Sequence, residues 1–218
     1  MLFDFGGTLD ADGVHWSPRF YDAYRAAGGA LDFTAFDPIF QVSDDAVACL
    51  PDIRRLAFHA AIEALARLLV SRLPDRVDAG EIAERVHGEA VAVVGRNRPV
   101  LERLRRRFRL GVVSNFTGNL QPCLEELGLA RLFVTLSDST LVGWTKPDAR
   151  IFTHTLARLD VPAQAAWMVG DNFDADIRGA ANVGMRTCWI APPDRAVPPG
   201  LVPSARIHRL PDIEAVLA

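Results

Sequence analysis

An aspartate near the N-terminus directly follows a short apolar run, in the segment Leu2–Leu9, which reads LFDFGGTL. Two glycines soon after Asp4 predict a tight turn beyond the carboxylate. If the run is a strand of a doubly wound sheet, Asp4 projects from its carboxyl end, where ligands bind. Asp4 is therefore a candidate catalytic residue, although an ordinary strand-ending aspartate in a glycine turn explains this segment equally well.

A second polar group follows the apolar run Leu110–Val113, which delivers Ser114 and Asn115 to the start of a predicted helix. Helix N-termini offer unpaired N–H groups and positive potential, so Ser114 and the neighbouring amides can hold a phosphate oxygen. An ordinary helix cap is the alternative interpretation.

The third candidate is Lys146, which lies just before Pro147 in the segment GWTKPD. Proline favours the first turn of a helix, so the lysine should sit at an element boundary. A lysine is a compact cation that can neutralise a phosphate and an attacking carboxylate together. An isolated lysine is more often simply exposed.

The fourth segment is the most specific, because Asp171, Asp174 and Asp176 follow the apolar run Trp167–Val169 within one loop and helical turn. Clustered carboxylates repel one another unless they are solvated or share a cation, and hard oxygen ligands suit magnesium. Helix capping explains any one of them, but three beside a strand end favour a metal site.

Apolar runs alternate with helical patterns along most of the chain, which predicts an α/β fold with a doubly wound parallel sheet. The runs predicted as strands are Leu2–Phe3, Leu110–Val113, Leu132–Leu136, Trp167–Val169 and Thr187–Ile190. The predicted helices are Gly118–Leu127, Ala149–Leu159, Asp174–Val183 and Pro211–Leu217. We expect residues 1–9 and 98–218 to form this Rossmann-like core.

Residues 10–97 break the alternation, because their periodic segments are almost all helical, and we expect them to form an inserted helical cap. The clearest helix places apolar residues from Leu56 to Leu73 at helical spacing. Packing in the cap explains this stripe better than a cofactor site does. Five prolines and a glycine between Ala191 and Pro203 predict an irregular surface loop.

In their order, the four segments resemble the haloacid dehalogenase (HAD) superfamily, whose phosphatases carry four motifs at successive strand ends of a Rossmann-like core. The resemblance covers Met1–Leu9 and about Arg98–Ile190, with a helical cap inserted after the first motif. It implies a magnesium-dependent hydrolase of a small phosphorylated metabolite that forms an aspartyl-phosphate on Asp4. It also implies that Ser114, with Asn115 beside it, binds the phosphoryl group.

The same resemblance assigns the remaining charged residues. Lys146 would orient and neutralise the phosphoryl group. Asp171 would ligate Mg²⁺ together with Asp4 and the main-chain oxygen of Gly6. Asp176 would support these ligands without contacting the metal ion itself.

The sequence departs from the family pattern at Gly6. Family phosphatases carry a second aspartate there, which protonates the leaving oxygen and later activates water. General acid–base catalysis is worth about 10²- to 10⁴-fold in rate, so its loss should slow the hydrolysis of alkyl phosphates without abolishing phosphate binding. Asp10 and Asp12 are close in sequence, but nothing in the sequence places either in the site.

Three alternatives therefore stay open. Metal-independent dehalogenases of the superfamily also lack the second aspartate, but they tend to lack the acid that corresponds to Asp171. A phosphonatase-like reaction would need a cap lysine that is not evident. Gly6 is also compatible with a catalytically weakened phosphate-binding or regulatory protein.

The chain has 218 residues, of which 50% are hydrophobic, and a formal net charge of −3. This charge is too near neutral and of the wrong sign for nucleic-acid binding, so the composition favours an enzyme that acts on small molecules. The basic run Arg103–Arg109 has helical apolar spacing and is better explained as a solvated helix face than as a nucleic-acid patch. Cys49, Cys123 and Cys188 form no CxxC pair and are expected to be free thiols that fill the core in a reducing compartment. Neither the particular substrate nor the oligomeric state is specified by these residues.

The N-terminal segment has no signal-peptide pattern and no apolar stretch approaches membrane-spanning length, so a cytoplasmic protein without membrane contact is the default expectation. The two-residue apolar run before Asp4 is short for a strand, which leaves open whether Met1 is the natural start. Cap residues His15, Trp16 and Arg19 are possible substrate contacts, although ordinary cap-surface positions are favoured. The other histidines have no ligand spacing: His59, His87, His154 and His208.

Overall fold

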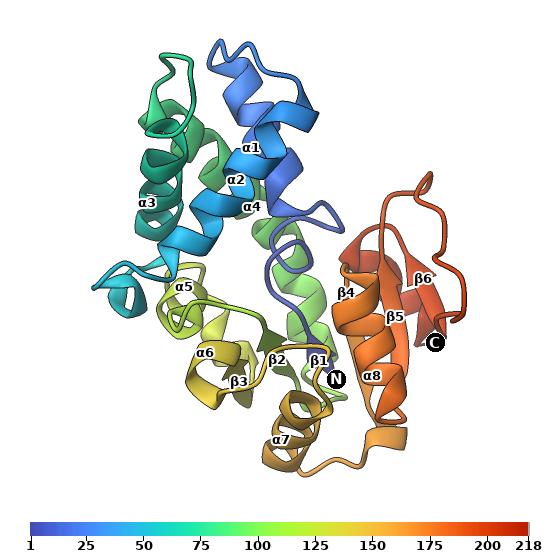
Figure 1. Ribbon diagram of the computed structural model, residues 1–218. Helices are drawn as coiled ribbons and strands as arrows, with labels where there is room; N and C mark the ends of the chain where they lie inside the picture. The colour runs from blue at the N-terminus through green and yellow to red at the C-terminus, as the bar shows by residue number, and fades with distance from the viewer. Residues whose placement is uncertain (218) are drawn as a thin grey trace.

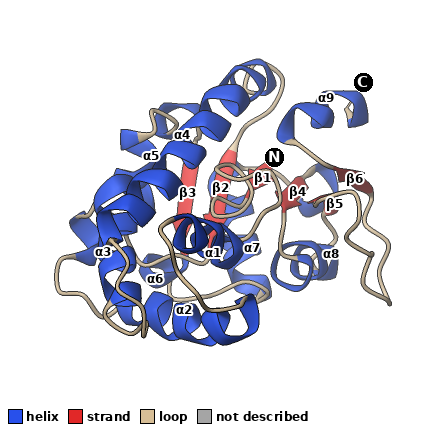
Figure 2. Ribbon diagram, turned by 90° about the horizontal axis from the view of Figure 1, so that it is seen from above, coloured by secondary structure: helices blue, strands red, loops and turns tan. Residues whose placement is uncertain are grey.

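A six-stranded parallel sheet forms the core of the protein in the computed structural model, which describes residues 1–217. The strands lie in the order β3-β2-β1-β4-β5-β6, which can be followed across Figure 2. Their bounds are β1 Leu2–Phe3, β2 Gly111–Ser114, β3 Thr135–Asp138, β4 Trp167–Gly170, β5 Arg186–Ile190 and β6 Ala205–Ile207. The predicted α/β class with a doubly wound parallel sheet is therefore confirmed.

Helices cover both faces of this sheet (Figure 2). One face carries α4, Ala79–Leu104, with α5, Leu120–Glu126, and α9, Ile213–Val216; the other carries α7, Ala149–Leu159, and α8, Gly179–Asn182. The short helix α6, Ser139–Val142, follows β3. Short 3-10 turns span Ile53–Arg55, Ala130–Leu132, Ala163–Ala165 and Leu210–Asp212.

Alternation along the buried strands explains this layering, because successive side chains of a strand point to opposite faces. Leu2 and Met168 are paired in register, and both belong to the apolar cluster that includes α7. Phe3 and Val112, one position further along their strands, are also paired and belong to the larger cluster on the other face. Continuous apolar runs are what a sheet buried on both faces requires.

A helical insert lies between β1 and β2 in the chain and sits above the sheet in Figure 1. We use this name for residues 15–97, which contain α1, Trp16–Ala26, α2, Phe33–Val47, α3, Phe58–Val70, and the first part of α4. The helical character predicted for residues 10–97 is thus observed. One continuous apolar cluster joins Phe3 and Phe5 of the core to Phe20 and Phe58 of the insert, so the two parts pack directly on each other.

Helix α4 connects the two parts without a break, because its 26 residues run past residue 97, where the sequence suggested a boundary. Asn97 lies in this helix, and its side-chain amide donates hydrogen bonds to the Leu9 carbonyl at 3.2 Å and to Asp12 at 3.0 Å. Pro99 also lies within the helix. The division of the chain into two subdomains at residue 97 stays a prediction. Among the described helices, α4 included, none combines the length and apolarity that crossing a bilayer requires.

Several local predictions differ from the structure. β6 was not predicted; it is a three-residue strand that pairs with β5. The helix predicted over Asp174–Val183 is a π-helical segment, Phe173–Arg178, followed by α8. Cys123 and Cys188 are free and buried as expected, but Cys49 is exposed, so the prediction that it fills the core is wrong.

Candidate active site

The candidate site lies where the strand order reverses. The chain leaves β3 on one side of β1 and continues with β4 on the other side, which opens a crevice at the carboxyl ends of β1 and β4. Asp4 directly follows β1, Asp171 directly follows β4, and Ser114 is the last residue of β2. Residues that are far apart in sequence, such as Asp4 and Asp171, therefore meet at one edge of the sheet.

Two donors converge on one oxygen of the Asp4 carboxylate. The Ser114 hydroxyl donates a hydrogen bond to Asp4 Oδ1 at 2.8 Å, and Lys146 Nζ lies 2.7 Å from the same oxygen. The Asp4 side chain is 9% exposed and that of Lys146 is 2% exposed. Because all three residues also line the cavity described below, the carboxylate is both fixed in orientation and accessible to a ligand.

Lys146 is held in place through its main chain. The Asn115 side chain donates to the Lys146 carbonyl at 3.0 Å and accepts the Lys146 N–H at 2.7 Å. The lysine Nζ also contacts Asp176 Oδ1 at 2.6 Å. Burial lowers the pKa of Lys146, but the charges of Asp176 and Asp4 outweigh burial and raise it above its ordinary value. The lysine is therefore a cation in the site, and Asn115 fixes its loop.

Asp171 has one oxygen satisfied and one left over. Thr8 donates a hydrogen bond to Asp171 Oδ1 at 2.9 Å, whereas Oδ2 is buried and has no hydrogen-bond partner among residues 1–217. Burial, and then the nearby charge of Asp4, raise the pKa of the Asp171 carboxyl above its ordinary value. A buried carboxylate oxygen without a donor is costly, and a bound cation would remove that cost.

In the glycine turn predicted after Asp4, position 7 requires a glycine. Its φ is +88°, a conformation that favours glycine, and a Cβ at this position would lie 2.5 Å from Asp171 Oδ2. The backbone after β1 can therefore approach the end of β4 closely because residue 7 has no side chain.

The acidic residues here fit a divalent cation. Asp4, Asp171 and Asp176 each offer a carboxylate oxygen, and these atoms all lie within 4.8 Å of one another. When all three carboxylates are ionised and Lys146 is protonated, two negative charges remain, which a divalent ion balances. Hard oxygen donors of this kind suit Mg²⁺. Asp176 already accepts from Lys146 and from the Asn172 N–H at 3.0 Å, an arrangement compatible with a supporting role.

The space beside Gly6 is occupied by Trp16 of the insert. A Cβ at Gly6 would lie 3.1 Å from the indole nitrogen Nε1, which donates a hydrogen bond to Asp10 Oδ2 at 3.1 Å. Trp16 also packs edge-on against Phe58. The indole thus lies where a longer side chain at position 6 would extend.

Asp10 and Asp12, the acids nearest to Gly6 in sequence, are engaged in structural contacts. Asp10 is fully buried and accepts from the Gly7 N–H at 2.7 Å and from Arg19 at 2.8 Å. Asp12 accepts from Asn97 at 3.0 Å. Neither acid is among the residues that line the cavity. Arg19 is buried within the insert, where it also donates to the Val86 carbonyl of α4, and this differs from the cap-surface position favoured for it.

A cavity of about 500 Å³ lies between the strand ends and the insert. The core contributes Asp4, Ser114 and Lys146, and the insert contributes His15 and Trp16 among others. A ligand on Asp4 would therefore contact both parts of the protein. The volume suits a small metabolite.

Residues 1–184 match the family model described as haloacid dehalogenase-like hydrolase. The chain belongs to this family. The resemblance to this family that the sequence indicated is thereby confirmed.

The curated relatives of this HAD-family chain include phosphatases. It is 33% identical over 120 residues to the pyrimidine 5'-nucleotidase YjjG of Escherichia coli (strain K12), covering 54% of this chain and 53% of the relative. It is 35% identical over 113 residues to the phosphoserine phosphatase of Thermus thermophilus, covering 51% and 45%. The chain spans about half the length of these relatives.

Solved structures of the family match over the whole chain. A 2-haloacid dehalogenase from Pseudomonas syringae aligns with a TM-score of 0.56 at 27% identity, covering 99% of this chain and 96% of that one. The HAD hydrolase YfnB from Bacillus subtilis, solved with bound magnesium, aligns with a TM-score of 0.62 at 18% identity, with the same coverage. The second likeness shows the fold alone.

One residue of the site, Thr8, was missed from the sequence. It lies in the first segment, so the predicted meeting of that loop with Asp171 could have drawn attention to its hydroxyl. Trp16 was named as a possible substrate contact and does line the cavity, but no signal in the sequence indicated that its ring would lie beside Gly6.

Proposed function

We propose that this HAD-family hydrolase cleaves a small phosphorylated molecule with the help of Mg²⁺, using Asp4 as the nucleophile. The observation that carries the proposal is the arrangement around Asp4: two donors fix one carboxylate oxygen, and the unpaired Oδ2 of Asp171 lies in the adjoining acidic cluster. Relatives named as a nucleotidase and a phosphoserine phosphatase support phosphoryl chemistry.

In the proposed reaction, an oxygen of Asp4 attacks the phosphorus and the bond to the leaving oxygen breaks, which gives an aspartyl-phosphate and the free product. Water then attacks the phosphorus, so inorganic phosphate leaves and Asp4 is regenerated. Lys146 remains protonated and offsets negative charge on the phosphoryl oxygens. The Ser114 hydroxyl, which donates to Asp4 in this structure, can donate instead to a phosphoryl oxygen.

Magnesium would be held by Asp4 and Asp171, with the Gly6 carbonyl as a third protein ligand, and would supply charge neutralisation between nucleophile and phosphate. Asp176 would keep its bonds to Lys146 and orient that side chain. The fit rests on the buried, unpaired oxygen of Asp171 and on the two excess negative charges of the cluster.

The helical insert is proposed to act as a cap that selects the substrate, because it contributes His15 and Trp16 to the cavity. Position 6 supplies no proton, so a leaving group that departs as a weak base should react faster than an alkoxide. Acyl and aryl phosphates meet this requirement.

Gly6 also supports a second candidate, a 2-haloacid dehalogenase, in which Asp4 would attack carbon and displace halide. The 27% identity to a solved enzyme of that name adds to its case. The position of Asp171 in one acidic cluster with Asp4 favours phosphoryl transfer, because it supplies the cation ligand that chemistry at carbon does not need.

One screen distinguishes the candidates. Phosphate release from acetyl phosphate, p-nitrophenyl phosphate, a nucleoside monophosphate and a sugar phosphate is measured with and without Mg²⁺, beside halide release from 2-chloropropionate. We expect magnesium-dependent phosphate release that Asp4→Asn abolishes. Halide release that persists in chelator would establish the dehalogenase instead, and magnesium-dependent phosphate binding without turnover of any substrate would favour the weakened, regulatory protein.

A further inference from the structure

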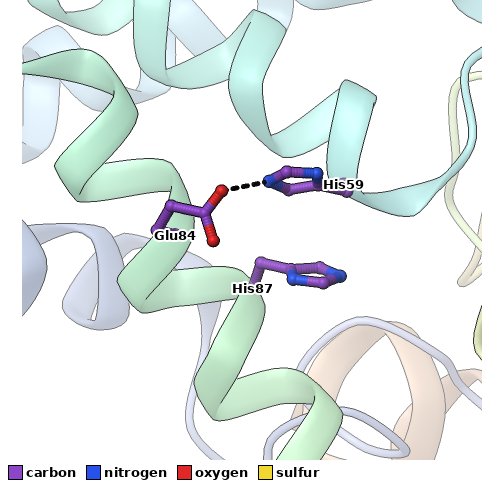
Figure 3. Close-up of side chains that lie close together, drawn as sticks. All are labelled: His59, Glu84 and His87. Atoms are coloured by element: carbon purple, nitrogen blue, oxygen red, sulfur yellow. Dashed lines mark ion pairs between the residues drawn. The ribbon is translucent and has the colours of Figure 1, made fainter.

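A second group of metal-binding side chains lies in the helical insert, outside the candidate active site. His59 of α3 faces Glu84 and His87 of α4 (Figure 3). Each residue offers one ligand atom, and these atoms all lie within 4.8 Å of one another. None of the three is among the residues that line the cavity at Asp4. No ligand spacing was recognised for these histidines in the sequence, because His59 joins Glu84 and His87 only through the packing of α3 against α4.

The ring of His59 is only partly satisfied. Its Nε2 lies 3.0 Å from Glu84 Oε1, but the two groups are not aligned as a hydrogen bond. Nε2 is therefore a buried nitrogen without a hydrogen-bond partner among residues 1–217. A buried polar atom of this kind requires an explanation, and an ion between the ring and the carboxylate supplies one.

The other two ligands come from one helix face. Glu84 and His87 are three residues apart in α4, so their side chains are neighbours on the helix surface. Glu-x-x-His is a spacing that helical bundles use to hold metal ions. The rings of His59 and His87 lie with centroids 4.5 Å apart at 39°, which brings the second imidazole to the same point.

Glu126 of α5 completes the surroundings. Its carboxylate lies 3.3 Å from His87 Nε2 and accepts a hydrogen bond from the main-chain N–H of His59 at 3.2 Å. A carboxylate behind a ligating histidine orients the ring and raises its basicity. Two carboxylates with two neutral imidazoles also balance the charge of a divalent ion.

We propose that His59, Glu84 and His87 bind a divalent transition-metal ion of the zinc class, which links α3 to α4. Imidazole nitrogens with one carboxylate favour zinc over magnesium. Zinc–nitrogen bonds are about 2.0–2.1 Å, so two ligand atoms of a tetrahedral zinc ion are roughly 3.4 Å apart. The ligand atoms here lie within 4.8 Å of one another, so side-chain rotation would have to bring them closer by up to about 1.4 Å. Water or Glu126 takes the fourth position.

Zinc itself is the probe for the test, titrated into the metal-stripped full chain by calorimetry. Excess Mg²⁺ is present so that the acidic cluster at Asp4 does not bind zinc. One zinc ion per chain is expected to bind to the wild type and to raise its Tm by several degrees. His59→Gln and His87→Gln should each weaken zinc binding at least about ten-fold and remove the rise in Tm.

Glu89→Gln, an exposed acid on the same helix, and His154→Gln, a histidine on α7, are matched controls that should leave zinc binding unchanged. Equal zinc affinity in wild type and in the folded His59→Gln and His87→Gln variants would overturn the proposal. If the histidine variants do not fold, the exposed Glu84→Gln variant and the visible spectrum of bound cobalt(II) decide it. A cobalt spectrum without histidine nitrogen ligation, or one unchanged in Glu84→Gln, would also overturn it.

Discussion

Asp171, with its unpaired oxygen, is the residue on which magnesium binding should depend most. Asp4 and Asp171 are the two proposed carboxylate ligands, and Asp171→Asn removes one of their two negative charges. We expect Mg²⁺ affinity to fall at least about ten-fold in calorimetric titration. Asp174→Asn is the matched control, since Asp174 lies three residues further along the chain, in the π-helical segment, but is exposed and pairs with Arg178. Equal affinities in wild type and Asp171→Asn would exclude Asp171 as a ligand.

Asp4 should be the residue that carries the phosphoryl group. Beryllofluoride bound to an aspartate mimics an aspartyl-phosphate, so in the presence of Mg²⁺ it should inhibit the hydrolysis of an activated aryl phosphate by the wild type. The Asp4→Asn variant should lose all turnover of the same substrate. The exposed residue Asp22, substituted in Asp22→Asn, serves as the control and should keep wild-type rates. An Asp4→Asn protein that retains the wild-type rate would show that the nucleophile lies elsewhere.

Gly6→Asp should restore a general acid only if Trp16 moves. A Cβ at Gly6 would be 3.1 Å from the indole, so the single variant is crowded, whereas Gly6→Asp combined with Trp16→Ala has room for the carboxylate. We expect the double variant to raise sugar-phosphate turnover relative to aryl-phosphate turnover by at least about ten-fold. Trp16→Ala alone is the reference for the comparison.

The opposite result is also informative. A wild type that hydrolyses sugar phosphates as fast as aryl phosphates, and that gains nothing in the double variant, would mean that a water, the substrate or another cavity residue supplies the proton. His15, which lines the cavity, would then be the first residue to substitute.

At this scale the sequence predicted the meeting of Asp4, Ser114 and Asp171, because the carboxyl ends of parallel strands lie at one edge of the sheet. Lys146 lies in the loop between α6 and α7, and its place beside Asp4 was expected only from the family resemblance. It could not predict the contact between Trp16 and Gly6 or the cluster around His59. Those contacts depend on the packing angles between helices, which spacing within one helix does not determine.

Among the helices, two glycines in open surroundings should respond in opposite directions to the same substitution. Gly95 lies inside α4 and Gly28 just after α1, and an added Cβ would meet nothing within 4 Å at either site. Gly28 has a φ of +90°, whereas Gly95 is helical. Gly95→Ala should raise the free energy of unfolding by about 0.5–1 kcal/mol, and Gly28→Ala should lower it by about 1 kcal/mol.

Urea unfolding followed by circular dichroism measures both changes, and each variant is the control for the other. If both variants shifted the free energy of unfolding in the same direction, backbone conformation would not be the cause of the difference.

The elements predicted best are those with a strong and continuous pattern. Ala149–Leu159 was predicted with the bounds that α7 has. β6 was missed because Ala205–Ile207 is short and places Arg206 between two apolar residues, so no apolar run marks it. The π-helical turn at Phe173–Arg178 was also not evident, since Asp176 is turned inward to accept from Asn172 and Lys146, a contact that periodicity does not show.

For the whole molecule, the buried ion pair between Arg19 and Asp10 ties the insert to the loop after β1. Their side chains are 6% and 0% exposed, and Arg19→Met would leave the Asp10 carboxylate buried without its cation. We expect a loss of about 3–5 kcal/mol in the free energy of unfolding, measured in urea. Arg67→Met breaks the exposed pair with Glu63 and should cost no more than about 0.5 kcal/mol. Equal costs would show that burial does not set the strength of the Arg19 pair.

Sequence periodicity indicated a helical region between the first and second motifs, and the structure has one. It gave no reliable end for that region, because α4 keeps the same helical spacing as it passes from the insert to the sheet. A boundary between packed parts is a property of contacts, and a continuous helix carries no mark of it.

Helix α4 therefore links the position of the insert to that of the loop after β1. Its 26 residues make a rod of about 39 Å at 1.5 Å per residue. Pro99 has no N–H to bond the Gly95 carbonyl one turn earlier, so the rod is most easily bent between these two residues. Asn97 sits at this pivot and holds both the Leu9 carbonyl and Asp12. A rotation of the insert that opens the cavity would also displace the loop after β1, which begins at Asp4. Substrate entry and the orientation of the Asp4 carboxylate would then be coupled.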